Sequence, residues 1–153
     1  MWLENQKTNN SKMKKILIIN SNYYKQISKN LVLNAKSELK KENFKISILE
    51  VPGTFEIPVA LSKNIKRFDG FVVLGCVVKG QTPHFDLICS STFNAIINLS
   101  IKYKKPIGNG IITAFNLNQA KERSIKKNNK KPNKGIEAAR AVIKILKNGP
   151  KKI

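Results

Sequence analysis

Apolar segments alternate with amphipathic segments along this chain. Residues 15–19, apolar after Lys15, and residues 71–78 form uninterrupted apolar runs, which are typical of strands buried on both faces. Residues 45–51 and 106–113 have a weaker β-rich pattern and predict two further strands. The segments between them carry apolar residues every three or four positions, which indicates helices that cover the strands.

Five helices are expected, and they span residues 26–41, 54–67, a stretch that begins after residue 82, 117–124 and 135–147. This alternation of strand and helix predicts an α/β fold in three layers, with a four-stranded parallel sheet and helices on both faces. We expect one domain over residues 15–150 and a flexible polar tail over residues 1–14. The positions expected to face inward are Ile27, Leu31, Val32, Ala35 and Leu39 in the first helix, Leu87, Ile88, Ala95, Ile96 and Leu99 in the third, and Ile136, Ala139, Ile143 and Leu146 in the last.

The size and composition allow a packed core. The chain has 153 residues, of which 41% are hydrophobic. No stretch approaches the roughly 18 to 20 apolar residues that span a bilayer, and the polar start lacks the apolar core of a secretory signal. Cys76 and Cys89 form neither a CxxC motif nor a disulfide framework. We therefore expect a cytoplasmic protein with no membrane partner.

The charge of the chain is strongly positive. Lys and Arg outnumber Asp and Glu by 29 to 9, which gives a net charge of +20 and an electrostatic attraction for nucleic acid. However, Lys, Asn and Ile, which A/T-rich codons encode, make up 64 of the 153 residues, so a biased genome alone would produce this excess. Arginine, whose planar fork reads bases, is scarce. We expect weak, salt-sensitive binding at most, and no specific nucleic-acid partner.

Ligands of parallel sheets bind beyond the carboxyl ends of the strands. This rule places the candidate site in the loops 20–25, 51–56, 78–84 and 113–116. The chain contains no GxGxxG motif and no P-loop. Its single histidine and two distant cysteines do not match a zinc site, so no metal is expected.

The loop 78–84 carries the strongest candidates for chemistry. Thr82 is expected to cap the following helix and Pro83 to begin it, which aims free backbone N–H groups at an anion in the crevice. His84, the only histidine, is suited to proton transfer near neutral pH. An ordinary capped helix and a structural histidine are the alternatives to these roles.

Other candidates lie in the neighbouring loops. Thr54 is expected to cap a second helix, and Glu56 in its first turn either accepts hydrogen bonds from a polyol or heterocycle or satisfies the helix dipole. Tyr23 and Tyr24 follow the first strand; either one of them stacks on a planar ring, or both are ordinary surface tyrosines. Arg123 is a good phosphate clamp, and the alternative is a solvated basic loop over residues 121–134.

Four motifs follow one another along the chain. They are VPGTFEIP at 51–58, LGCVVKGQTPHFD at 74–86, GIIT at 110–113 with QAKER at 119–123, and NKG at 133–135. In this order and spacing they resemble the 6,7-dimethyl-8-ribityllumazine synthase family, and the resemblance extends from about Lys15 to Leu146. It implies a flavodoxin-like fold and a transferase that catalyses the penultimate step of riboflavin biosynthesis.

The implied reaction condenses 5-amino-6-(D-ribitylamino)uracil with 3,4-dihydroxy-2-butanone 4-phosphate, releases phosphate and water, and uses no metal or organic cofactor. The resemblance also implies a role for each matching position. His84 corresponds to the proton-transfer residue, and Lys134 to the lysine of the NKG segment. The phosphate-binding positions are Gln81, Thr82 and Arg123, and the positions that bind the pyrimidine and ribityl groups are Tyr23, Thr54, Phe55, Glu56, Cys76, Val77, Val78 and Asn109.

The resemblance further implies a homopentamer, or a multiple of pentamers, with each site at a subunit boundary. Arg123 is then expected to reach the site of a neighbouring subunit, and Asn109 takes the position that closes the pocket from the neighbour. An association with riboflavin synthase stays open. Two alternatives for the function also stay open: archaeal-type riboflavin synthase activity, and a basic scaffold or nucleic-acid-binding homologue that has lost catalysis.

Overall fold

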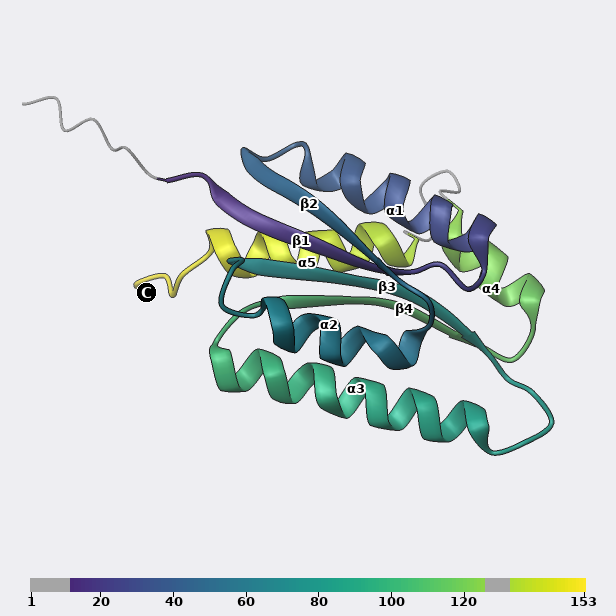
Figure 1. Cartoon of the computed structure of the whole chain (residues 1–153). Coiled ribbons are helices and arrows are strands. Elements are labelled where there is room, and N and C mark those ends of the chain that lie inside the picture. The colour runs from purple at the N-terminus through teal and green to yellow at the C-terminus, as the bar shows by residue number, and fades with distance from the viewer. Residues whose placement is uncertain (1–11, 126–132) are drawn as a thin grey trace, which may run out of the picture.

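The computed structural model describes residues 12–125 and 133–153. Within them, four strands form one parallel sheet in the order β2–β1–β3–β4, as the alternating pattern predicted (Figure 1). The central position of β1 and β3 explains why their segments are continuously apolar, since both of their faces are covered. The strands are β1 (Lys14–Ser21), β2 (Phe44–Val51), β3 (Gly70–Val78) and β4 (Ile107–Ala114).

Helices cover both faces of the sheet. α1, α4 and α5 pack on one face, and α2 and α3 pack on the other (Figure 1). The predicted three-layer αβα architecture of the flavodoxin-like class is therefore confirmed. The helices are α1 (Lys25–Leu39), the short 3-10 helix η1 (Thr54–Glu56), α2 (Ile57–Asn64), α3 (His84–Tyr103), α4 (Leu117–Ser124) and α5 (Lys134–Lys147).

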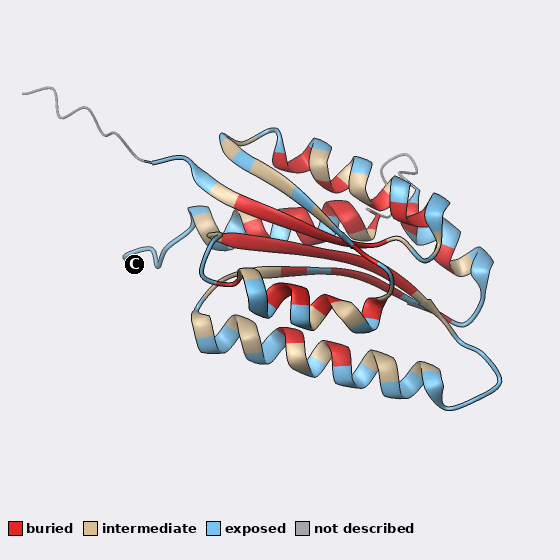
Figure 2. Cartoon of the chain, viewed as in Figure 1, coloured by how far each residue is buried: buried red, intermediate tan, exposed pale blue. Residues whose placement is uncertain are grey.

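The sheet divides the core into two halves. Successive side chains of a strand point to opposite faces, so Ile16 of β1 packs under α1 and α5 while Leu17 packs under α2. Val72 and Phe71 of β3 divide in the same way. Figure 2 shows both central strands as buried along most of their length. The two half-cores fix the positions of the strand ends, where the site lies.

Most predicted inward faces are confirmed. The apolar stripe of α1 is buried, and Ile136 and Ala139 of α5 are buried with it. The prediction for Leu87 was wrong, because its side chain is 67% exposed on the outer surface of α3. Only Thr92 and Ile96 of this 20-residue helix are buried, so α3 covers the sheet with one narrow stripe.

The two threonine caps predicted from sequence were also wrong. Thr54 begins η1, and its side chain is buried against Gly75 instead of capping a helix; the α-helix starts only at Ile57. It ends at Asn64 and not at residue 67. Pro83 is the N-cap residue of α3, and no side chain, Thr82 included, caps that helix.

Two predicted segments lie largely outside the described residues. These are the polar tail over residues 1–14, of which only the last three positions are described, and the basic loop that ends at Lys134. Asn133 begins the described part again, and its Oδ1 accepts a hydrogen bond of 2.8 Å from the backbone N–H of Ile136. Within residues 12–125 and 133–153, no helix is long and apolar enough to cross a membrane.

Candidate active site

A cavity of about 580 Å³ opens at the carboxyl ends of the strands. The loop after β1, the connection from β2 to α2, the end of β3 and the start of α3 contribute its walls, and these segments meet at one end of the sheet (Figure 1). This is the edge at which parallel sheets bind ligands. The lining residues are Tyr23, Tyr24, Gly53, Thr54, Phe55, Glu56, Cys76, Val77, Val78, His84 and Ile88.

Aromatic side chains form one wall of the cavity. The rings of Tyr23 and Tyr24 meet edge to face, with centroids 5.0 Å apart. Tyr23 and Phe55 are 72% and 63% exposed, which is unusual for large aromatic groups in a single chain. Two exposed flat surfaces beside a cavity offer a stacking site for a planar heterocycle.

The connection between β2 and α2 supplies polar groups. Thr54 is buried at the base, and Glu56 folds back over Gly53, whose added Cβ would lie 2.8 Å from Glu56 Oε2. The backbone N–H of Glu56 donates to the Gly53 carbonyl at 3.2 Å. The Glu56 carboxylate therefore stands at the cavity wall as an acceptor for ligand hydroxyl or N–H groups.

The end of β3 forms the floor of the cavity. Cys76 is buried there, and burial raises the pKa of its thiol to about 11. Burial likewise raises the pKa of Tyr24, and the neighbouring Cys76 adds to that effect. Both groups are therefore neutral near pH 7, and Cys76 acts as a packing group and not as a thiolate nucleophile.

His84 stands where the cavity meets the start of α3. It is the first residue of this 20-residue helix, and no side chain caps the helix. The first backbone N–H groups of α3 therefore remain available, and the helix dipole adds a positive potential beside the imidazole. An imidazole beside free backbone N–H groups is an arrangement that can serve proton transfer near a bound anion.

The loop before α3 is tied to the end of β4. The backbone N–H of Lys79 donates to the Ala114 carbonyl at 2.9 Å, and its ammonium lies 5.4 Å from the centroid of the Phe115 ring. Gln81 and Thr82 at the loop tip are exposed and do not line the cavity. The contacts of Lys79 hold the base of the loop while its tip stays open to solvent.

Besides Gln81 and Thr82, three more predicted site residues lie outside the cavity of the single chain. Arg123 is exposed on α4, where its Nη1 donates to the Gln119 carbonyl at 3.1 Å. Asn109 is exposed on β4, one of the two edge strands of the sheet. Lys134 begins α5, and its ammonium is 3.0 Å from a carboxylate oxygen of Glu137.

Three lining residues were not assigned to the site from sequence. Ile88 was expected to face the core, yet it follows His84 by one helical turn, and that spacing was the available signal. Tyr24 was considered beside Tyr23 for stacking but was not assigned to the site, and Gly53 has no side chain that a sequence pattern could single out. Among the described residues, no group of three His, Cys, Asp or Glu side chains is arranged to hold a metal ion.

Comparison with known proteins connects this geometry to a family. The family model described as 6,7-dimethyl-8-ribityllumazine synthase matches residues 13–148, which include every predicted site residue. The chain belongs to this family. Three relatives carry the same name: those of Campylobacter curvus (38% identical, covering 86% of both chains), Campylobacter jejuni (40% identical, 86% of this chain and 87% of the relative) and Bartonella tribocorum (36% identical, 86% and 89%).

Proposed function

We propose that this protein condenses 5-amino-6-(D-ribitylamino)uracil with 3,4-dihydroxy-2-butanone 4-phosphate to 6,7-dimethyl-8-ribityllumazine, with release of phosphate and water. The observation that carries the proposal is a single cavity in which the aromatic, carboxylate and imidazole groups of the family motifs meet. The relatives are named for this synthase, so the archaeal-type riboflavin synthase and the inactive scaffold are not favoured.

The pyrimidine substrate is proposed to occupy the aromatic wall and the floor. Its flat ring stacks on Tyr23, while the backbone at the end of β3, from Cys76 to Val78, pairs with the edge of the ring. The ribityl hydroxyls lie near Phe55 and donate to Glu56. This orientation would bring the free amine of the ring near His84, which also lines the cavity.

The phosphate substrate is proposed to bind at the start of α3. The free backbone N–H groups of that helix, with Gln81 and Thr82 before it, form the anion site. His84 then transfers protons as the imine forms and the phosphate leaves. Arg123 pairs with the phosphate in a bidentate way, and Lys134 adds positive charge nearby.

A neighbouring subunit is proposed to complete the site, since Arg123, Asn109 and Lys134 lie outside the cavity of their own chain. The outer surface of α3 supports assembly, because Leu87, Ile97 and Ile101 are each more than half exposed. A stripe of large apolar groups on one helix is typical of a protein interface. We propose a homopentamer, or a multiple of it, and leave riboflavin synthase as a candidate partner.

A cytoplasmic location is proposed on separate grounds. Cys76 and Cys89 are both free, and burial raises the pKa of each thiol. Free cysteines without a disulfide are typical of proteins kept in a reducing compartment. Fractionation of cells that express the untagged protein tests this point.

The reaction is tested by a continuous optical assay with both substrates, against a control without protein. The His84→Ala variant is expected to turn over about 100-fold more slowly, the usual loss for an acid–base group. The Ser90→Ala variant, changed at an exposed position of the same helix, serves as the matched control. Wild-type turnover in His84→Ala would remove this residue from the mechanism.

The shared site is tested by mixing subunits. His84→Ala and Arg123→Ala chains are each expected to be impaired when they assemble alone. Coexpressed in equal amounts, they are expected to recover about a quarter of the wild-type sites, because a site then needs one intact residue from each of two neighbours. If the turnover of the coexpressed chains never exceeds the summed turnover of the two single variants, both residues belong to a site formed by one chain.

A further inference from the structure

Charge is unevenly distributed between the two ends of the sheet. Each helix runs antiparallel to its strand, so the C-termini of α1, α2, α3 and α5 meet the starts of the strands at the end opposite the cavity (Figure 1). Lysines there complement the negative ends of the helix dipoles. The lysines in these last turns are Lys36, Lys63, Lys102, Lys144 and Lys147.

The acidic residues at this end are already engaged. Glu38 and Glu42 form ion pairs with neighbouring basic side chains at 2.8 to 2.9 Å. Asp69 accepts a hydrogen bond of 2.7 Å from the backbone N–H of Lys15. The other described acidic residues lie near the carboxyl ends of the strands or on segments that begin there, and they are Glu50, Glu56, Asp86, Glu122 and Glu137.

Besides Lys105, five basic side chains gather around a hollow of about 320 Å³ beside the start of β1, and we call these five the amino-end basic surface. They are Lys12, Lys14, Lys15, Lys66 and Arg67. Within the described part of the chain, none of them forms a salt bridge. Asp69 is the one carboxylate among the residues that line the hollow.

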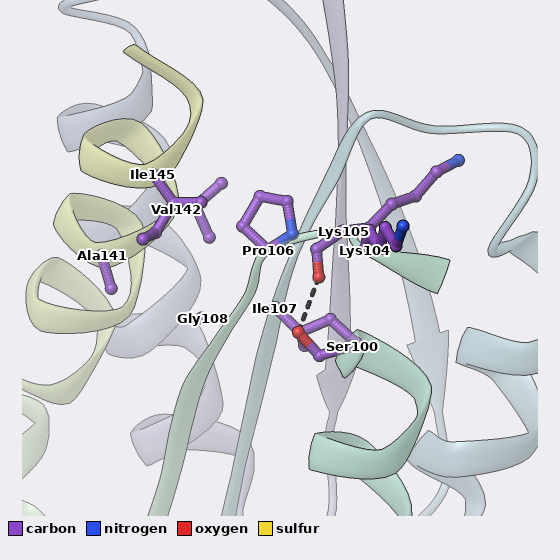
Figure 3. Close-up of a pocket in the computed structure, with 9 residues that line it drawn as sticks. All are labelled: Ser100, Lys104, Lys105, Pro106, Ile107, Gly108, Ala141, Val142 and Ile145. Atoms are coloured by element: carbon purple, nitrogen blue, oxygen red, sulfur yellow. Dashed lines mark hydrogen bonds between the residues drawn. The ribbon is translucent and has the colours of Figure 1, made fainter. Parts of the chain in front are cut away.

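The end of α3 adds further positive charge beside this surface. Lys105 also lines the hollow, and its ammonium donates to the carbonyls of Ile65 and Phe68 at 2.6 and 2.7 Å, which anchors the end of α2. Figure 3 shows Lys104 and Lys105 at the start of β4, beside a second hollow. The positive potential of the amino end therefore extends beyond the five side chains.

We propose that the amino-end basic surface binds the phosphate backbone of a nucleic acid, without reading its sequence. Unpaired cations around a shallow hollow complement a chain of phosphates. Phe68 is half-buried, so the hollow lacks an exposed ring on which bases stack, and one arginine does not provide base readout. Codon bias accounts for how many lysines the chain has, but not for the gathering of unpaired ones at one end.

A lipid surface fits this hollow less well. Peripheral membrane binding combines basic residues with apolar groups that enter the headgroup region. Met13 is the only large apolar side chain of the hollow that is exposed. Binding that comes from charge alone, spread over five separate side chains, is instead the pattern of non-specific contact with nucleic acid.

The test measures binding of the full-length protein to a labelled DNA duplex of about 12 base pairs by fluorescence anisotropy. Five phosphate contacts predict a slope of log affinity against log salt of about −4.5, so affinity falls about 500-fold between about 50 and 200 mM salt. The Lys66→Glu, Arg67→Glu double variant removes two of the five phosphate contacts. The magnitude of the slope is therefore expected to fall to about 2.7 or below.

The matched control is the Lys25→Glu, Lys29→Glu double variant, which changes net charge equally in the first turns of α1, at the cavity end of the sheet. It is expected to keep the wild-type slope, and both variants are expected to form lumazine at the wild-type rate. Equal loss of binding in the two double variants would overturn the proposal in favour of bulk charge. A wild-type slope near zero, or binding to phosphatidylserine vesicles but not to DNA, would also overturn it.

Discussion

Replacing Gly108 with alanine tests the closest packing between the sheet and α5. Gly108 lies on β4 and faces α5, where an added Cβ would be 2.8 Å from the carbonyl carbon of Ala138 and closer still to its oxygen. The Cβ would also lie 2.9 Å from a methyl group of Val142. The Ala138 carbonyl belongs to the helix backbone and cannot rotate away, so α5 must move by about 1 Å to restore normal carbon contacts.

The expected loss of stability follows from two opposing effects. Glycine to alanine at a tolerant position stabilises a protein by about 0.4 to 1 kcal/mol, because the unfolded chain loses freedom. Overpacking of a core costs about 1 to 3 kcal/mol, and backbone contact places Gly108→Ala at the upper end. We expect a net loss of about 2 kcal/mol, which lowers the Tm by roughly 4 to 8 °C for a chain of this length.

Urea unfolding at one fixed protein concentration measures this loss, since assembly makes stability depend on concentration. Gly149→Ala is the matched control, because an added Cβ there meets nothing within 4 Å. Its free energy of unfolding is expected to stay within about 0.5 kcal/mol of the wild type. If Gly108→Ala proves as stable as the wild type, the close approach of α5 to β4 is refuted.

Three further predictions concern single side chains. Burial raises the pKa of Cys76 to about 11, so near pH 7 iodoacetamide should alkylate it about 100-fold more slowly than an ordinary thiol, as followed by mass spectrometry. Burial raises the pKa of Glu38, but hydrogen bonds from Lys41 and Arg140 outweigh it, and the net pKa is lowered from 4.5. Glu38 thus stabilises the fold above about pH 4.5 and loses this effect as the pH falls through its lowered pKa, so urea unfolding of Glu38→Gln should depend less on acid pH. Asn133→Ala removes the N-cap of α5 and the hydrogen bond from Asn133 Nδ2 to the Ser124 carbonyl, and it should cost about 1 to 2 kcal/mol in thermal unfolding, whereas Asn133→Asp keeps the cap and loses only the second bond.

The layers of the fold could be predicted from the sequence because a strand or helix face that is buried carries apolar residues at regular positions. The continuous apolar run of β3 and the helical spacing in α1 and α5 each reflect a surface covered by the same chain. The prediction from apolar spacing failed for Leu87, because this apolar side chain is exposed on α3. A sequence records that a side chain is apolar, but not whether its own chain or another one covers it.

The two capping predictions failed for a different reason. A threonine before a helical pattern is compatible with several local structures, and contacts distant in sequence decide among them. Thr54 is held against Gly75 of β3, which draws its hydroxyl away from the helix start. At α3 the helix begins with Pro83 as its N-cap, and Thr82 remains exposed in the preceding loop.

The residues of the candidate site could be predicted where they closely follow the carboxyl end of a strand. His84, Glu56 and Tyr23 follow three different strands and meet in the cavity, because parallel strands bring their carboxyl ends to one edge. Ile88 was missed, since an apolar residue on a helix fits a core as well as it fits a pocket wall. Arg123 is not among the cavity residues of its own chain, and no pattern within one sequence gives the arrangement of its neighbours.

The proposed sharing of the site restricts the symmetry of the assembly. The cavity is built on β1, β2 and β3, whereas Asn109 lies on the edge strand β4 and Arg123 on α4, which follows it. Two different surfaces of the chain must then meet, one from each neighbour. An isologous dimer pairs a surface with itself, but a contact between two different surfaces repeats from subunit to subunit until the rotation closes a ring. Each subunit of such a ring gives a cavity to one neighbour and β4 with α4 to the other. Every site is complete only when the ring is closed, so loss of assembly and loss of turnover should coincide.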